Sequence, residues 1–327
     1  MLSVVVATVV ALGAAGGAGY AAHRALDGGG PALAGNGVPL PTATTTPPAP
    51  VTPSPTPTAD PDASFTIVAA GDFLMHGPVN ADARTTGGGY DYSAELAPLD
   101  PWIQGADLAL CHLEVPVAPP GTAPSGYPVF AAPPQIIPAI KAQGWDGCST
   151  ASNHSVDRGF AGIKATLDAL DAAGLGHSGT ARSAAEEQSP QLYRLQRGGQ
   201  TITVADIAST YATNGMPVDA DKPWSVDRID VARIVAQATA ARAAGADLVI
   251  ATVHAGNEYQ TAPNAQQQEV DQQLADSGVI DLVIGHHVHV PQPIAKLAGG
   301  PGGQGMWVAY GLGNYISNQD QSTVGIA

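Results

Sequence analysis

The chain has 327 residues, enough for one large domain or two smaller ones. It carries 13 Lys and Arg against 28 Asp and Glu, a formal net charge of −15, which argues against binding of nucleic acid through a broad basic surface. A phosphate-bearing substrate held by metal ions stays compatible with this charge.

The first 27 residues are expected to be a membrane anchor or a signal segment. Residues 2–22 form an uncharged run about as long as the ~20 residues that cross a bilayer. No Lys or Arg precedes the run, unlike in a standard signal peptide, and its Ala- and Gly-rich end leaves cleavage open. We predict a single N-terminal pass through the cell membrane with the domain outside. The alternative is a cleaved signal and a secreted protein.

Residues 28–63 are predicted to be a disordered linker. Residues 28–62 contain no aromatic residue, Lys or Arg, and Pro and Thr dominate between Pro39 and Pro61. Such a composition cannot bury enough apolar surface to fold. The folded domain is therefore expected to span residues 64–327. Residues 323–326 would begin a further strand where the chain stops, so we expect a truncated C-terminus.

Strand and helix patterns alternate through this domain, and their order predicts an α/β core. The predicted strands are residues 65–70, 107–111, 147–151, 247–253, 279–284 and 306–310, the last clear one. The predicted helices are residues 99–105, 134–143, 158–173, 227–244 and 266–275. A hairpin is expected to join residues 191–197 to 200–208.

The two cysteines, Cys111 and Cys148, are too few for a disulfide framework. Each lies at or near the end of an apolar strand pattern. We expect buried free thiols, with one disulfide between neighbouring strands as the alternative.

Polar side chains follow the carboxyl ends of five apolar runs, where an open α/β sheet places its ligand site. They are Asp72, Glu114, Asn153 with His154, His254, and the cluster His286, His287 and His289. A basic loop or a chance run of histidines is the alternative for the last cluster alone. Five unrelated surface positions would not all keep this placement.

Two carboxylates, one carboxamide and up to five imidazoles suit Mn, Zn or Fe. Their number is sufficient for two divalent ions, and paired ions ~3.5–4 Å apart clamp and polarise a phosphoryl group. Asn153 fits as a neutral oxygen ligand. His154 next to it would stabilise or protonate the leaving oxygen, as a catalytic residue.

Six motifs in this order resemble those of the CapA/PgsA family, which is tied to poly-γ-glutamate capsule synthesis and export and is similar to the calcineurin-like metallophosphoesterases. The resemblance covers about Phe65 to Asn318. The motifs are Gly71-Asp72, Leu113-Glu114-Val115-Pro116, Ser152-Asn153-His154 with Asp157 and Gly159, residues 254–259 (HAGNEY), residues 285–289 (GHHVH) with Gln292, and residues 310–315 (YGLGNY).

The resemblance implies a four-layer α/β/β/α sandwich of the metallophosphoesterase type, with metal ions at the strand ends. Asp72 matches the first metal aspartate, Glu114 the bridging position, and Asn153 and His154 the Asn-His motif. His254 matches the lone histidine ligand. The remaining pair comes from His286, His287 and His289, and the register of these three stays open.

Two departures from the phosphoesterase pattern weaken the expectation of efficient phosphoesterase activity. Leu74 stands where phosphoesterases have a histidine, with His76 two positions further on, and Glu114 replaces an aspartate. Other residues are candidates for the pocket or for contacts with the ligands. They are His76, His112, Asp157 (the alternative is a helix cap), Glu258 and Gln292.

Two functions are compatible with these residues. The first is a cell-surface, metal-dependent hydrolase or transferase acting on a phosphoester or amide. The second is a non-catalytic, metal-dependent subunit that binds an anionic polymer such as poly-γ-glutamate beside the synthase or export subunits of the membrane. His154 favours the enzyme, because a pure binder does not need a histidine next to a ligand Asn.

Overall fold

The computed structural model describes residues 63–319. The expected N-terminal anchor, the linker as far as residue 62 and the expected strand at residues 323–326 lie outside this range. Within residues 63–319, no helix has the length and apolar character needed to cross a bilayer.

One sheet is entirely parallel and has the strand order β11-β1-β2-β3-β4. Apolar residues line its two long central strands, which is typical of a parallel sheet covered on both faces. The strands are β1 (Ile67–Phe73), β2 (Leu108–Leu113), β3 (Gly147–Ser149), β4 (Gly176–Ser178) and β11 (Asn314–Ile316).

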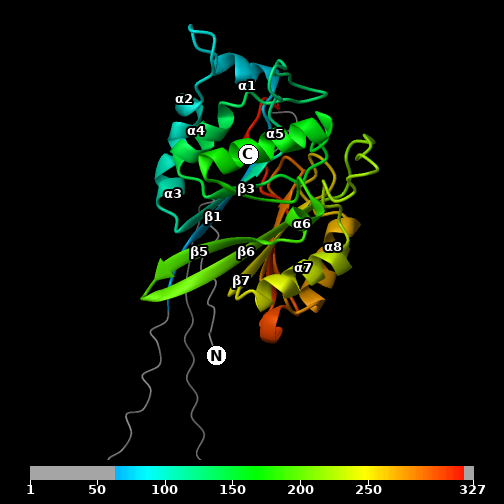
Figure 1. The fold of residues 1–327 in the computed structure, drawn as a ribbon. Helices are drawn as coiled ribbons and strands as arrows, with labels where there is room; N and C mark the ends of the chain where they lie inside the picture. The colour runs from blue at the N-terminus through cyan, green and yellow to red at the C-terminus, as the bar shows by residue number, and fades with distance from the viewer. Residues whose placement is uncertain (1–62, 320–327) are drawn as a thin grey trace, which may run out of the picture. The chain divides into compact units, whose positions relative to one another are not determined.

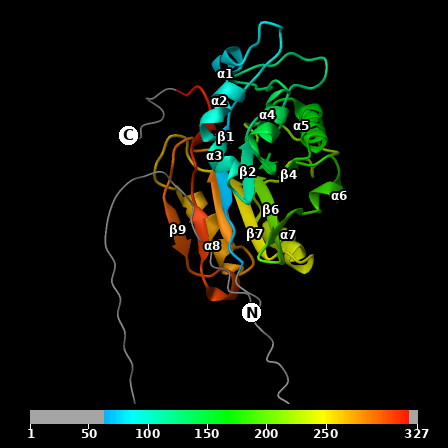
Figure 2. The same ribbon diagram turned by 90° about the vertical axis from the view of Figure 1, so that its left-hand side faces the viewer.

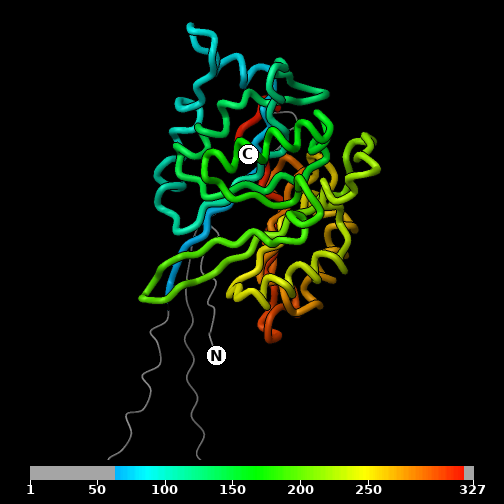
Figure 3. Tube along the Cα trace, viewed as in Figure 1, coloured from blue at the N-terminus to red at the C-terminus, as the bar shows by residue number. Residues whose placement is uncertain are grey.

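The second sheet is mixed and has the order β5-β6-β7-β8-β10-β9. Its edges are antiparallel: the hairpin β5–β6 at one side and the pair β10–β9 at the other. The hairpin is drawn as two long green arrows in Figure 1, and Figure 3 traces the same segment as a green tube. The strands are β5 (Gln191–Arg197), β6 (Gln200–Thr210), β7 (Leu248–His254), β8 (Leu282–His286), β9 (Ile294–Leu297) and β10 (Met306–Ala309).

The two sheets pack against each other, and helices cover their outer faces. Leu108 and Leu110 of β2 pack with Val204 of β6 and Ile250 of β7 in an apolar cluster between the sheets. The helices α4 (Ile136–Gln143) and α5 (Gly159–Ala173) belong to the cluster on the outer face of the first sheet. On the second sheet the covering helices are α7 (Val231–Ala243) and α8 (Ala265–Asp276). Figures 1 and 2 show both pairs.

The periodicity of α5 explains its position. Ile163, Leu167 and Leu170 follow one another at helical spacing and are almost completely buried. Each such side chain contributes roughly 1.5–3 kcal/mol by leaving water. The helix ends at Gly174, whose φ of 67° is the left-handed conformation that glycine adopts without strain.

The remaining elements are short. They are α1 (Gly77–Asp82), α2 (Ser93–Leu96), α3 (Asp100–Gln104), α6 (Ala184–Glu187) and the 3-10 turns η1 (Ala97–Leu99) and η2 (Pro301–Gly303). Of these, only α3 with η1 was expected. The strands β4, β9 and β11 were also missed, and three or four residues are too few for a period of two to stand out.

The predicted α/β class is confirmed, but several predicted strands end too early in the sequence. We expected β1, β7 and β8 to end before Asp72, His254 and His286, but each strand contains its polar residue. The helix α7 begins at Val231 rather than Asp227, since Asp230 caps it by accepting from the Arg233 N–H.

The prediction of free thiols is wrong, and the alternative, one disulfide between neighbouring strands, is confirmed. Cys111 and Cys148 form a disulfide. The two residues are direct partners in the parallel register of β2 and β3, with their Cα atoms 4.4 Å apart. This separation lies within the range that a disulfide spans.

Candidate metal centre

The carboxyl ends of four strands bring the predicted side chains together. Asp72 is near the end of β1, Glu114 directly follows β2, and His254 and His286 are the last residues of β7 and β8. All four side chains are buried. His254 and His286 are paired in the register of the second sheet, while Asp72 and Glu114 come from the first. The cluster therefore lies where the two sheets meet.

Asp72 accepts hydrogen bonds from the histidine cluster. Its Oδ1 lies 2.8 Å from Nδ1 of His286, and its Oδ2 accepts from the backbone N–H of His287 at 3.2 Å. Nδ1 of His289 is also 3.2 Å from Oδ2. Burial alone would raise the pKa of Asp72, but the bonds from His286 and His289 lower it well below the ordinary value. The carboxylate is therefore ionised and available to a cation.

Glu114 has no hydrogen-bond partner on either carboxylate oxygen among residues 63–319, although its side chain is completely buried. Its Oε1 lies 3.9 Å from Nε2 of His254 and 3.9 Å from Nε2 of His289. Burial raises the pKa of Glu114 to about 8. A buried carboxylate left without partners is costly unless a cation or a proton neutralises it. Glu114 is thus a fitting bridging ligand.

His287 and His289 have φ angles of 87° and 61°. These left-handed conformations are uncommon for residues other than glycine and are typical of constrained sites. Nδ1 of His287 has no partner within the described part of the chain, and burial lowers the pKa of this ring to about 4. A neutral ring with a free nitrogen lone pair is a metal-ligand donor.

Oδ1 of Asn153 and Nε2 of His254 face each other at hydrogen-bond distance. The Asn153 amide nitrogen donates to Oδ1 of Asn214 at 3.2 Å, which turns Oδ1 of Asn153 toward Nε2 of His254, 2.8 Å away. Burial lowers the pKa of His254 well below its ordinary value, so this ring is neutral. The pair can share a cation or a single proton.

His154 is held by the carboxylate of Asp157. Nδ1 of His154 lies 2.8 Å from Oδ2 of Asp157, which also accepts from the backbone N–H of Phe130 at 2.6 Å. Asp157 is therefore not the cap of α5, whose capping position is Arg158. Burial lowers the pKa of His154, but the hydrogen bond to Asp157 and the charge of Glu114 outweigh it, so the net pKa is raised. The ring can hold a proton on Nε2 for a substrate.

The side chains form four candidate sets of metal ligands. Within each set, every residue offers one ligand atom, and these atoms lie within 4.8 Å of one another. The sets are Asp72, Glu114 and His289; Glu114, His254 and His287; Glu258, His287 and His289; and Asp72, His112 and His254. The first two sets share Glu114, as expected for a bridging residue. Carboxylate and imidazole donors in this mixture suit Zn, Mn or Fe. Together with the unpartnered Glu114, the donor set fits a divalent metal centre.

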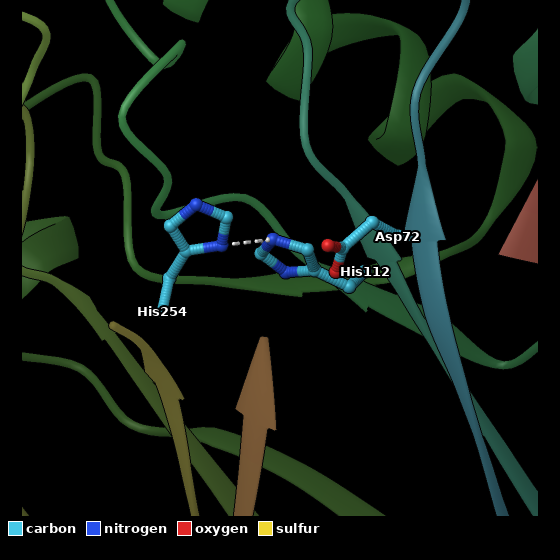
Figure 4. Close-up of side chains that lie close together, drawn as sticks. All are labelled: Asp72, His112 and His254. Atoms are coloured by element: carbon cyan, nitrogen blue, oxygen red, sulfur yellow. Dashed lines mark hydrogen bonds between the residues drawn. The ribbon is translucent and has the colours of Figure 1, made fainter. Parts of the chain in front are cut away.

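His112 lies within the cluster rather than at its edge. Figure 4 shows its ring between His254 and Asp72, with a hydrogen bond to His254. The ring also stacks on His286, with centroids 4.0 Å apart. Burial lowers the pKa of His112 well below its ordinary value, so it is neutral as well.

The other candidates lie further from the ligand atoms. Gln292 supports a loop, because its amide donates to the carbonyls of Gln260 and Ala262. His76 is half-buried and accepts from the backbone N–H of Asn318. Glu258 is exposed and joins the cluster only in the set with His287 and His289.

Two asparagines and one serine at the centre were not among the candidates. Asn314 of β11 lies 2.9 Å from Nδ1 of His289, Asn214 orients Asn153, and Ser149 lies 2.8 Å from Nδ1 of His112. Asn314 belongs to one of the quoted motifs and could have been chosen on that ground. Asn214 lies in a loop without periodicity and carries no such signal.

A cavity of about 270 Å³ lies elsewhere, between β4 and β6. Asp206 and Asp227 line it, but Asp206 is occupied by Ser178 and Thr252, and Asp227 contacts Arg233. None of the predicted site residues lines this cavity.

The structure is thus a mixed α/β fold with a cluster of candidate metal ligands at its strand ends. Residues 66–319 match the family described as bacterial capsule synthesis protein PGA_cap. The chain belongs to this family. The match confirms the resemblance drawn from the six motifs and covers almost the same residues.

Two relatives from Bacillus carry related names. The capsule biosynthesis protein CapA of Bacillus anthracis is 27% identical over 58% of this chain and 44% of its own length. The PGA biosynthesis protein CapA of Bacillus subtilis (strain 168) is 27% identical over 57% of this chain and 46% of its own length. The chain thus spans less than half of these relatives.

A third relative is the probable polyglutamine synthesis accessory protein Rv0574c of Mycobacterium tuberculosis, 28% identical over 65% of this chain and 56% of its own length. Among solved structures, the calcineurin-like phosphoesterase YfkN of Bacillus subtilis is similar with a TM-score of 0.45 and 20% identity, over 71% of this chain and 74% of that chain.

Proposed function

We propose that this protein is a metal-dependent hydrolase that acts on a phosphoester or amide bond in the synthesis or export of a capsule polymer such as poly-γ-glutamate. The kind of polymer is inferred from the family description and from the names of the relatives. The observation that carries the enzymatic part is His154, oriented by Asp157 beside the ligand cluster.

Two divalent ions are proposed to bind through one bridging and five further ligands: Asp72, Glu114, Asn153, His254, His287 and His289. Glu114 would bridge, because the two sets of ligand atoms share it. His286 belongs to neither set and instead bonds to Asp72 through Nδ1. Bound ions of this kind polarise the scissile group and neutralise the charge that develops on it.

His154 supplies the acid chemistry in this proposal. Its Nδ1–H donates to Asp157, which holds the ring and leaves Nε2 to give a proton to the leaving oxygen or nitrogen. The hydrogen bond to Asp157 and the charge of Glu114 outweigh burial and raise the pKa of His154, which favours the protonated ring. The ring of Phe130, 4.8 Å away edge to face, limits the rotation of the imidazole.

The experiment compares His154→Ala with the unchanged full chain, with bis-p-nitrophenyl phosphate as the probe. We expect equal metal content and hydrolysis lowered by about 10²–10⁴-fold, the usual contribution of a general acid. His177→Ala is the control, since His177 lies outside the cluster and contacts Asp171. Equal hydrolysis by His154→Ala and the unchanged chain would contradict the catalytic role.

A non-catalytic role in polymer binding is the second candidate, and one observation favours it. Leu74 occupies the place of a phosphoesterase histidine and is buried in the apolar core. His76 does not replace it, because its Nδ1 accepts from the backbone of Asn318. The ion nearest Asp72 would then have fewer protein ligands. Bound metal without turnover of any phosphoester would support this candidate.

A location at the cell surface is part of the proposal and depends on residues 2–22 alone. Their uncharged run is long enough to anchor the domain outside the membrane. Fractionation of cells with external protease treatment tests it. Membrane-bound, protease-accessible protein supports the anchor, and a shortened form in the medium supports a cleaved signal.

A further inference from the structure

The buried histidine His112 lies at the centre but is not part of the proposed ligand set. Its two ring nitrogens are both occupied: Nδ1 lies 2.8 Å from Oγ of Ser149, and Nε2 lies 2.9 Å from Nδ1 of His254. Ser149, His112 and His254 thus form a hydrogen-bonded chain that ends at Oδ1 of Asn153, 2.8 Å from Nε2 of His254. All four side chains are buried.

This chain is compatible with two arrangements of its protons. In the first, Ser149 donates to Nδ1 of His112, Nε2–H of His112 donates to His254, and Nε2–H of His254 donates to Asn153. Every polar atom on the path is then satisfied without a metal ion. In this arrangement, however, the nitrogen of His254 that faces Asn153 and Glu114 carries a proton and cannot bind a cation.

The second arrangement reverses every bond. Nδ1–H of His254 donates to Nε2 of His112, Nδ1–H of His112 donates to Ser149, and the Ser149 hydroxyl donates to the carbonyl of Cys111 at 3.4 Å. Nε2 of His254 and Oδ1 of Asn153 then both present lone pairs. Both arrangements hold three protons, one on the serine and one on each ring, so they have the same net charge and are two states of one equilibrium.

We propose that His112 and Ser149 act as a tautomer relay, defined here as a pair of positioning residues that accept Nδ1–H of His254 and Nδ1–H of His112 in turn and so favour the metal-binding form of His254. The inference rests on the proposed metal centre and assigns a role to residues that do not themselves bind the ion. Ligating histidines commonly donate their second N–H to a carboxylate or carbonyl. Here a neutral histidine, with a serine behind it, is the acceptor.

The relay requires that the acceptor at Nε2 of His112, rather than the volume of the ring, supports metal binding. The His112 ring also stacks on His286 and lies 4.9 Å from the His254 ring, centroid to centroid. Two variants separate these roles. His112→Phe keeps the aromatic packing and loses the acceptor, whereas His112→Gln loses the ring and keeps an amide oxygen that can accept from His254.

The first test measures the Zn²⁺ dissociation constant of the full chain by competition with a chelator. We expect His112→Phe to raise it about 10- to 100-fold, the usual effect of losing a partner of a ligating histidine. His112→Gln is expected to restore most of the affinity. Ser149→Ala is expected to weaken binding and Ser149→Thr to rescue it. Unchanged affinity in His112→Phe would overturn the relay while leaving the metal centre in place.

The second test uses the unchanged chain, so it does not depend on the folding of any variant. Selective ¹⁵N labelling of histidines reports which ring nitrogen carries the proton before and after Zn²⁺ is added. We expect His112 and His254 to be protonated at Nε2 without metal and at Nδ1 with it. An unchanged tautomer of His112, or direct coupling of ¹¹³Cd²⁺ to its Nε2, would overturn the relay. Absence of any metal binding would overturn the proposed metal centre together with it.

Discussion

Asp72 of β1 and His286 of β8 join the two sheets at the metal centre, with Oδ1 of the aspartate 2.8 Å from Nδ1 of the histidine. Both side chains are buried and lie 214 positions apart in the sequence. The bond therefore depends on the correct packing of one sheet on the other. It also keeps Asp72 ionised, which links the assembly of the fold to the charge of its site.

Removal of one ligand at a time should lower the metal content. Asp72→Ala, Asn153→Ala and His254→Ala each delete a donor from the cluster, so we expect less bound metal per chain by elemental mass spectrometry. His177→Ala is the matched control, because that histidine contacts Asp171 and lies outside the cluster. If all three variants kept the full content, the ligand set proposed above would be wrong.

Neutralising Glu114 should stabilise the metal-free protein and weaken metal binding. Glu114→Gln removes a buried carboxylate whose oxygens have no hydrogen-bond partner in residues 63–319. We expect the chelator-treated variant to unfold with a free energy higher by ~2 kcal/mol, since ionising a buried group without a partner is costly. Urea unfolding and metal content measure the two effects. A loss of stability without metal would show that Glu114 has a structural partner.

Gly71→Ala should separate β11 from β1 and disturb Asp72. A Cβ at residue 71 would lie 2.1 Å from the carbonyl oxygen of Gly313, and the neighbouring N–H of Asp72 donates to the same oxygen. Overpacking of this kind costs roughly 1–3 kcal/mol. The midpoint temperature of thermal unfolding and the metal content should both fall. Gly77→Ala should change neither, because its added Cβ would have no neighbour within 4 Å.

Asp271 on α8 should make the stability of the protein depend on pH. Burial raises the pKa of its carboxyl from 3.8 to about 7, and its Oδ1 has no partner among the described residues. From about pH 4 to pH 7 the unfolded chain has lost this proton and the folded chain has kept it, so the free energy of unfolding falls as pH rises.

Asp271→Asn should abolish that part of the pH dependence. The stability of the variant relative to the unchanged chain is expected to increase between pH 4 and pH 8 by up to about 4 kcal/mol, at about 1.4 kcal/mol per pKa unit. Glu269→Gln on the exposed face of the same helix is the control. Parallel pH profiles for Asp271→Asn and the unchanged chain would show that the carboxyl titrates normally.

The ligands were predictable where a long apolar run ends in a polar residue. The apolar runs of β1, β7 and β8 place Asp72, His254 and His286 at their carboxyl ends, and parallel strands bring such ends to one edge of a sheet. Glu114 after β2, and Asn153 and His154 after the short strand β3, were found in the same way. These residues needed no long-range information.

Periodicity could not predict which of the three clustered histidines direct their side chains at the metal centre. His286 still belongs to β8, but the φ angles of 87° at His287 and 61° at His289 break the alternation of a strand. Side-chain directions there depend on tertiary contacts, such as the His287 N–H bond to Asp72. The same holds for Asn214, which reaches Asn153 from a loop 61 positions away.

The pairing of Cys111 with Cys148 was only an alternative because composition does not give strand order. The two residues become neighbours only once β3 lies beside β2 in parallel register. That arrangement needs a crossover through α4, whose existence was predicted but whose face of the sheet was not.

The central claim is that this cluster binds divalent metal, and the most direct measurement is the metal content of the full chain by elemental mass spectrometry. We expect about two equivalents of Mn, Zn or Fe per chain, and fewer in the variants Glu114→Gln and His254→Ala. No bound metal after loading with each of these ions in turn would contradict it.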